Sequence, residues 1–221
     1  MKEEYWLTGL QSILSSQPAG LENQEDYLNA AVTVPLLEVD GKWSLLFEVR
    51  SRTLTWQPGE ICFPGGRIEN ADGTPLRTAV RETMEELGLA RNDIAVLGPL
   101  KHLVSPIGVS LIPFAVVLSP KAQLKPNPTE VEAVFTVPLE FLMAAQAVVG
   151  HMELATRPGA DFPRDLAPAS YSKEFKVRSS YPVFFYRYGE HVIWGLTARV
   201  LAGFLDYCRQ LRDMYDGREA W

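Results

Sequence analysis

Residues 63–89 read FPGGRIENADGTPLRTAVRETMEELGL, and this stretch decides how the chain is interpreted. Thr74 is a residue type favoured at helix N-caps, and Pro75 follows it at the first helical position. Gly88 stands where helices commonly end in a left-handed residue. The stretch therefore predicts a helix from Pro75 to Leu87, entered through a Pro-Gly-Gly loop.

This predicted helix has two dissimilar faces. At about 100° per residue, its apolar side chains gather on one side, as suits packing against a core. The other side holds Glu82, Glu85 and Glu86, which repel one another at i,i+3 and i,i+4 spacing. An acidic surface is one interpretation of these carboxylates, and a site for magnesium, which prefers oxygen ligands, is the other. The nearby Gly65–Gly66 bend brings bare backbone towards the helix and favours the cation site.

Together these features resemble the signature of the Nudix hydrolases, which use magnesium or manganese to cleave nucleoside diphosphates linked to another moiety. The resemblance is carried by residues 81–89, RETMEELGL, preceded by the Gly65–Gly66 pair. Asp72 or Gly73 stands in place of the first glutamate that is usual in the family.

The segment before the glycines is similar to one branch of that family, the coenzyme A pyrophosphatases. Residues 46–51, LFEVRS, are followed at the branch's spacing by Gly59 and then by residues 63–66, FPGG. Thr55 occupies a position where the branch carries an arginine. The resemblance covers about residues 30–205.

The resemblance implies an α/β fold, a Nudix-like α/β/α sandwich with a mixed β-sheet and a loop–helix–loop catalytic motif. It also implies a metal-dependent pyrophosphohydrolase that takes Mg²⁺ or Mn²⁺ and directs water at a phosphorus of a pyrophosphate bridge. The implied metal ligands are Glu82, Glu85, Glu86 and the Gly65 carbonyl; the catalytic residues are Glu86, Glu85, Arg81 and Glu130; and the residues near the substrate are Arg50, Arg52, Arg67 and Gly66.

Within this set, Glu86 is the first choice as general base and Glu130 is the alternative. The choice between them depends on the geometry of the site, which the sequence does not contain. Arg81 is expected to orient the carboxylates, with a simple surface ion pair as the other interpretation. The remaining arginines suit phosphate recognition, although solvation of a strand end explains them equally well.

Periodicity and turn signals organise the rest of the chain. Hairpin signals between strands and helices favour a mixed sheet. We expect one domain over residues 1–221, with an N-terminal helical extension at 1–28 and a Pro- and Gly-rich surface insertion at 150–172. Strands are predicted at 30–39, 43–50, 94–104, 109–118, 131–137 and, as one or two strands, 175–187; further helices are predicted at 3–14, 139–148 and 191–215.

The composition of the chain limits the kinds of binding partner and the cellular location that we expect. The chain has 221 residues, 47% of them apolar and 22% charged, which excludes a wholly disordered protein. Because the formal net charge is −6, we expect no nucleic acid partner, while a small nucleotide substrate remains compatible. No run of about 18 apolar residues occurs, so we expect no membrane partner. The N-terminal residues lack the apolar core of a signal peptide, which makes a cytoplasmic location the expectation, and a homodimer is compatible with the family.

Three functions stay open on the sequence. The first is hydrolysis of coenzyme A to 3′,5′-adenosine diphosphate and 4′-phosphopantetheine. The second is Nudix hydrolysis of ADP-ribose, a dinucleotide or a nucleoside triphosphate, and the third is a non-catalytic nucleotide-sensing domain. The Arg50-Ser51 run and Phe63-Pro64 favour the first, whereas Thr55 weakens it. The complete set of three glutamates disfavours the third, because an inactive site has no need to bear their repulsion.

Overall fold

The computed structural model of this chain describes residues 2–16, 23–168, 171 and 174–214. In that part of the chain, eight strands form one sheet, in which β3, β2, β1, β7 and β5 are neighbours in that order. β4 also pairs with β1, β6 with β7, and β8 with β2. The strands of this sheet are β1 (Leu28–Val39), β2 (Lys42–Arg50), β3 (Ile61–Cys62), β4 (Gly65–Arg67), β5 (Ile94–Pro99), β6 (Leu103–Ser105), β7 (Val109–Leu118) and β8 (Val131–Pro138).

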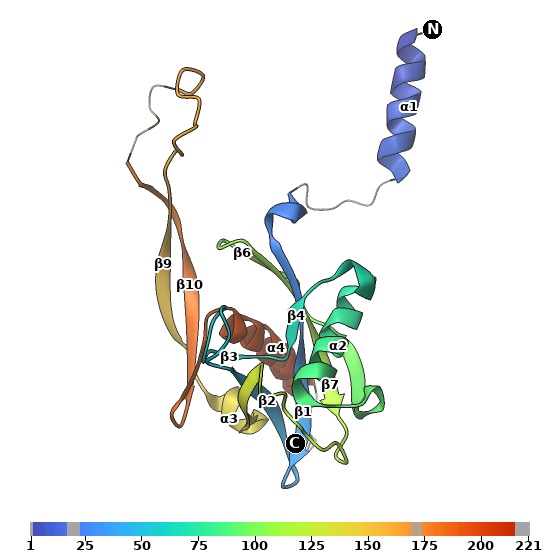
Figure 1. The fold of residues 1–221 in the computed structure, drawn as a ribbon, viewed down its shortest axis with the longest axis vertical. Coiled ribbons are helices and arrows are strands. Elements are labelled where there is room, and N and C mark those ends of the chain that lie inside the picture. The colour runs from blue at the N-terminus through green and yellow to red at the C-terminus, as the bar shows by residue number, and fades with distance from the viewer. Residues whose placement is uncertain (1, 17–22, 169–170, 172–173, 215–221) are drawn as a thin grey trace.

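A second sheet and four α-helices complete the described elements (Figure 1). In the second sheet, β10 lies between β11 and β9. Short 3-10 helices cover Gln24–Asp26, Asn70–Asp72 and Arg91–Asp93. The other elements are β9 (Val148–Thr156), β10 (Lys176–Tyr188), β11 (His191–Trp194), α1 (Lys2–Ser16), α2 (Pro75–Leu87), α3 (Leu139–Ala144) and α4 (Gly195–Met214).

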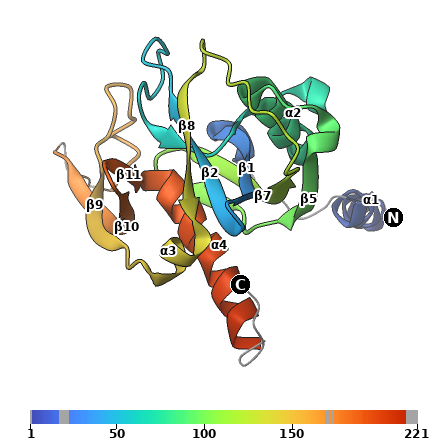
Figure 2. The ribbon, with the colours of Figure 1, turned by 90° about the horizontal axis from the view of Figure 1, so that it is seen from below.

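The large sheet is mixed, as predicted, because β1 runs parallel to β7 and antiparallel to β2. Helices α2 and α4 lie on opposite sides of its central strands (Figures 1 and 2). The predicted α/β/α sandwich is therefore confirmed. Among the described residues, no helix is long and apolar enough to cross a membrane.

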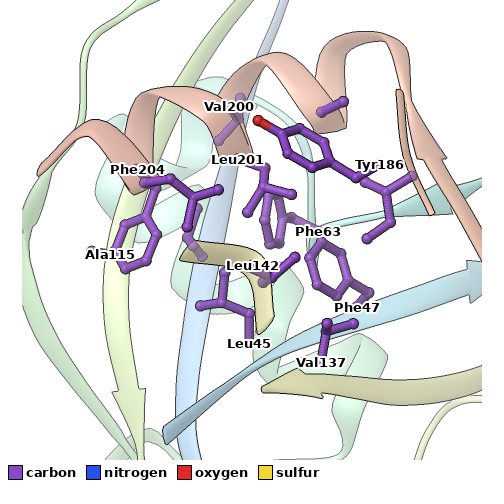
Figure 3. Close-up of a cluster of buried hydrophobic side chains, with 14 of the residues drawn as sticks. Leu45, Phe47, Phe63, Ala115, Val137, Leu142, Tyr186, Val200, Leu201 and Phe204 are labelled. Carbon is purple, nitrogen blue, oxygen red and sulfur yellow. The ribbon is translucent and has the colours of Figure 1, made fainter. Parts of the chain in front are cut away.

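Side chains along β2 point alternately to the two faces of the large sheet, where α2 and α4 pack. Successive side chains of a strand point to opposite faces of the sheet. Leu46 packs in the cluster beneath α2, whereas Leu45 and Phe47 pack with Leu201 and other residues of α4 (Figure 3). Each of these side chains is fully buried and contributes about 1.5–3 kcal/mol by leaving water. This packing fixes β2, and with it every residue that β2 presents to the α2 side.

Two predicted helices are shorter than expected. The helix predicted at 139–148 ends at Ala144, and residue 148 already begins β9. The helix predicted at 191–215 begins only at Gly195, because residues 191–194 form β11. Gly195 has a left-handed φ of +63°, which separates the strand from the helix. The strand predicted at 94–104 is likewise two strands, β5 and β6.

The predicted insertion at 150–172 begins as a strand and not as a loop. β9 pairs with β10 over nine residues, and the pair extends as a long arm away from the large sheet (Figure 1). Within the predicted insertion, the prolines lie after residue 157, so residues 148–156 are free to join a sheet. The assignment of residues 1–221 to one domain stays a prediction.

Candidate active site

Helix α2 begins and ends as the sequence predicts. The Thr74 hydroxyl oxygen accepts a hydrogen bond from the Arg77 backbone N–H at 3.3 Å, which caps the first turn. Gly88 adopts a left-handed φ of +66° and donates its N–H to the Met84 carbonyl. On the apolar face of α2, Val80 and Leu87 pack with Leu46 of β2 and Val116 of β7, and this packing fixes the direction in which the acidic face points.

The glycines before α2 are needed because other backbone and side-chain atoms occupy the space of a Cβ. A Cβ at Gly65, where φ is +150°, would collide with the Ala31 carbonyl and the Val32 Cα of β1. A Cβ at Gly66 would collide with the carboxylate of Glu82. The bend therefore brings backbone directly against the acidic face of α2, as predicted.

The three glutamates of α2 have different surroundings. Glu86 is 6% exposed, and its Oε2 accepts the Gly65 N–H at 2.8 Å. The Glu82 side chain is 18% exposed and faces Gly66. The Glu85 side chain is 55% exposed. The structure thus places Glu82 and Glu86 at the glycine bend and leaves Glu85 towards solvent.

Arg81 links the acidic face to a buried aspartate. Its guanidinium contacts Glu82 at 2.9 Å and Glu85 at 3.1 Å. It also donates to both carboxylate oxygens of Asp72, at 2.8 and 3.0 Å. Asp72 accepts a third hydrogen bond from the Thr78 hydroxyl, and Arg81 is the main reason that the pKa of Asp72 lies well below its usual value. No role is predicted for Asp72 from the sequence, in which Asp72 or Gly73 stands in place of the family's first glutamate.

Glu48 is a site residue that the sequence analysis missed. It lies on β2, is 1% exposed, and its Oε1 has no hydrogen-bond partner in the described part of the chain. Burial, and next the negative charge of Glu86, raise the pKa of Glu48 well above its usual value. The signal was present: one charged residue interrupts an otherwise apolar run, LLFEV, in a strand that is buried on both faces.

Glu130 reaches the same place from the connection before β8. Its carbonyl accepts the Ser51 N–H at 2.8 Å, which ties this connection to the end of β2. Its negative charge raises the pKa values of Glu48, Glu82 and Glu86. Four glutamates from three segments therefore interact electrostatically.

These surroundings raise the pKa of Glu86 to about 8. Burial is the largest cause, and the negative charges of Glu82 and Glu130 act in the same direction. The hydrogen bond from Gly65 and the charge of Arg50 oppose it. An ionised Glu86 therefore costs folding free energy when no cation is bound.

We expect the metal-free protein to lose stability because of Glu86 as pH rises. The folded-state pKa is raised above the unfolded one, so the contribution is complete below about pH 4.5 and is lost as pH passes 8. Glu86→Gln should therefore be more stable than wild type at pH 8, by a few kcal/mol at most, and similar to it at pH 5. Denaturant unfolding in EDTA at both pH values measures this. An equal difference at both would contradict the raised pKa.

The donor set fits a divalent cation, although the side chains do not form a ready-made cage. Within the described residues, no three Asp, Glu, His or Cys side chains are arranged so that they could hold a metal ion. Arg81 engages Glu82, so a cation at Glu86 would compete with Arg81 for it. The unpartnered Oε1 of Glu48 and the excess of carboxylates suit a hard cation with oxygen ligands.

The predicted arginines differ in their relation to this acidic group. The charge of Arg50 acts on it and lowers the pKa values of Glu48 and Glu86. Arg52 is exposed and pairs with Glu132 at 3.1 Å. Arg67 is exposed on β4, directly after Gly66.

Comparison with known proteins gives consistent matches. A model of the NUDIX domain matches residues 27–157. The human mitochondrial coenzyme A diphosphatase NUDT8 is 33% identical over 195 residues, which are 87% of this chain and 70% of the relative. The mouse peroxisomal coenzyme A diphosphatase NUDT7 is 39% identical over 132 residues, 60% of this chain and 55% of that protein. Nudix hydrolase 3 of Caenorhabditis elegans is 32% identical over 204 residues, 90% of this chain and 81% of that protein.

Proposed function

This chain belongs to the Nudix family of pyrophosphohydrolases, and on that premise we propose that it hydrolyses coenzyme A or a coenzyme A derivative. The observation that carries the proposal is the gathering of Glu48, Glu82, Glu86 and Glu130 beside the Gly65–Gly66 bend. The motif from Arg50 to residues 63–66 and the names of two relatives, coenzyme A diphosphatases, support this substrate.

The proposed reaction cleaves the pyrophosphate bridge. Water forms a new bond to one phosphorus, and the bond between that phosphorus and the bridging oxygen breaks. The proton of the water passes to a carboxylate and then to solvent. With coenzyme A itself, the products are 3′,5′-adenosine diphosphate and 4′-phosphopantetheine, so one water is consumed for each bond broken.

Glu82, Glu86 and the Gly65 carbonyl are the groups that we propose hold Mg²⁺ or Mn²⁺, with Glu85 as a further ligand. When bound, such a cation neutralises the charge of the phosphates and of the developing transition state. Arg81 keeps Glu82 and Glu85 in place through its bonds to Asp72. Glu48 places a further, buried carboxyl group beside these ligands, with one oxygen that has no hydrogen-bond partner among the described residues.

Glu86 is also our choice for the group that takes the proton. The pKa of Glu86 in the metal-free protein, about 8, lies near neutral pH, and a general base works best when its pKa is near the working pH. Its Oε2 is held by the Gly65 N–H, which leaves Oε1 as the atom for the proton. Glu130 is the alternative base, because it lies on the connection that is hydrogen-bonded to the C-terminal end of α2 and acts on the same carboxylates.

The residues that we propose bind the phosphates lie around this acidic group. We propose that Arg50 and Gly66 contact the pyrophosphate, and that Arg52 and Arg67, which are exposed, contact the outer phosphate of coenzyme A. A guanidinium recognises a phosphate through two parallel hydrogen bonds. Arg52 would exchange its exposed partner, Glu132, for the substrate.

A second candidate is hydrolysis of another nucleoside diphosphate derivative, such as ADP-ribose. The observation that favours it is Thr55, which stands where the coenzyme A branch carries an arginine.

The cytoplasmic location and the homodimer stay predictions.

A substrate panel tests the proposal. We expect coenzyme A to be cleaved in Mg²⁺ or Mn²⁺ and not in EDTA, with the two products identified by mass spectrometry. Cleavage of ADP-ribose but not coenzyme A would favour the second candidate. Failure with every nucleotide and both cations would indicate a nucleotide-sensing domain.

A further inference from the structure

The loop between β2 and β3, residues 51–60, is held by its own hydrogen bonds. Arg50, directly before the loop, pairs with the far end of the loop, since its N–H donates to the Glu60 carbonyl and its carbonyl accepts the Gly59 N–H. Leu54 donates its N–H to the Ser51 carbonyl at 3.2 Å. The loop thus has a defined shape and is rooted two residues after Glu48, or about 7 Å along the strand.

Trp56 is the large aromatic residue of this loop and is 64% exposed. Exposing an indole costs hydrophobic free energy, and the loop does not bury it against the core. Its carbonyl lies 3.4 Å from Nε of Arg50, and the charge of Arg50 acts in turn on Glu48 and Glu86. One guanidinium therefore separates the backbone of Trp56 from the acidic group.

The parts of a nucleoside diphosphate follow one another in the same order as the acidic group, Arg50 and Trp56. Its base is separated from the phosphates by one ribose, so phosphates at Arg50 leave the base near the loop. An exposed aromatic ring on a loop whose backbone is hydrogen-bonded is a feature that binds a base by stacking. The loop follows the last residue of β2, which pairs with the first residue of β8, and it therefore lies next to the connection that carries Glu130 (Figure 2).

We propose that Trp56 is the base-binding residue of this site and stacks on the adenine of the substrate. The inference rests on the proposed function and adds the subsite that determines recognition of the nucleoside. Trp56 touches neither the reacting phosphorus nor the water, so it contributes to binding and not to the chemical step.

Variants of Trp56 test this inference, with the two reaction products as probes. 3′,5′-Adenosine diphosphate contains the base and 4′-phosphopantetheine does not. Trp56→Ala should raise the KM for coenzyme A and the inhibition constant of 3′,5′-adenosine diphosphate by about 10- to 100-fold. The kcat and the inhibition by 4′-phosphopantetheine should not change. Trp56→Phe, which keeps a stacking surface, should retain most of the affinity.

Trp43 supplies the matched control. It is 42% exposed, and it lies near the opposite end of β2 from the loop. Trp43→Ala should leave every one of these constants unchanged. Unchanged inhibition by 3′,5′-adenosine diphosphate in Trp56→Ala would overturn the inference, as would an equal loss for both products, which would indicate a collapsed loop.

The inference and the proposed function fail separately. Binding of 3′,5′-adenosine diphosphate is measured by calorimetric titration in Mg²⁺, without turnover. If coenzyme A is not cleaved but the wild type binds this nucleotide more tightly than Trp56→Ala, the proposed substrate is wrong and the base site stands. If the wild type does not bind it, or binds it no better than Trp56→Ala, the base site is wrong whatever the substrate.

Discussion

Glu86→Gln is expected to lower kcat for coenzyme A by roughly three orders of magnitude while the protein stays folded. The substitution keeps the size of the side chain, and the amide oxygen still accepts the Gly65 N–H that Oε2 accepts now. It removes the negative charge and the proton acceptor together. Steady-state kinetics in saturating Mg²⁺ and a thermal melt measure both parts of this expectation.

Glu85→Gln is the matched control for that substitution. It removes the same charge one residue earlier on the same helix, but from a side chain that is 55% exposed. We expect a loss at least tenfold smaller than that of Glu86→Gln. Turnover near the wild-type rate in Glu86→Gln would remove Glu86 from the mechanism. A large loss in Glu130→Gln combined with a small one in Glu86→Gln would identify Glu130 as the base.

Gly66→Ala is expected to lower kcat/KM by about 100-fold with little change in the melting temperature. The added Cβ would occupy the place of the Glu82 carboxylate, which is the far end of a flexible side chain and can turn away. Glu82 would then leave its position beside Glu86 and its 2.9 Å contact with Arg81. The fold would survive because no backbone has to move.

Gly65→Ala makes the contrasting case. Its Cβ would meet the Ala31 carbonyl and the Val32 Cα, which are fixed in β1, and φ is +150°. We expect the free energy of unfolding to fall by about 1–3 kcal/mol or more. Denaturant unfolding of both variants separates the two effects. Full activity in Gly66→Ala would mean that Glu82 does not have to occupy its present position.

The acidic helix was accessible from the sequence because its determinants are local. The N-cap at Thr74, the proline after it and the left-handed Gly88 act over one or two turns of backbone, and all three behave as expected. The same holds for the tight turn at Asp40-Gly41, where both residues adopt positive φ. At residues 191–194 the sequence predicts the start of a helix, but the chain forms a strand there because pairing with β10 decides its conformation.

What the sequence alone determined is therefore the helix, its acidic face and the glycine bend in front of it. The tertiary structure decided which carboxylates share the site. Pairing of β2 with β8 brings Glu48 and Glu130 together, and the hydrogen bond from the Asn127 N–H to the Glu86 carbonyl holds the connection before β8 against α2, while the Glu85 side chain faces solvent. Charges separated in sequence interact only after the sheet has formed, so their pKa values and their roles belong to the fold and not to the motif.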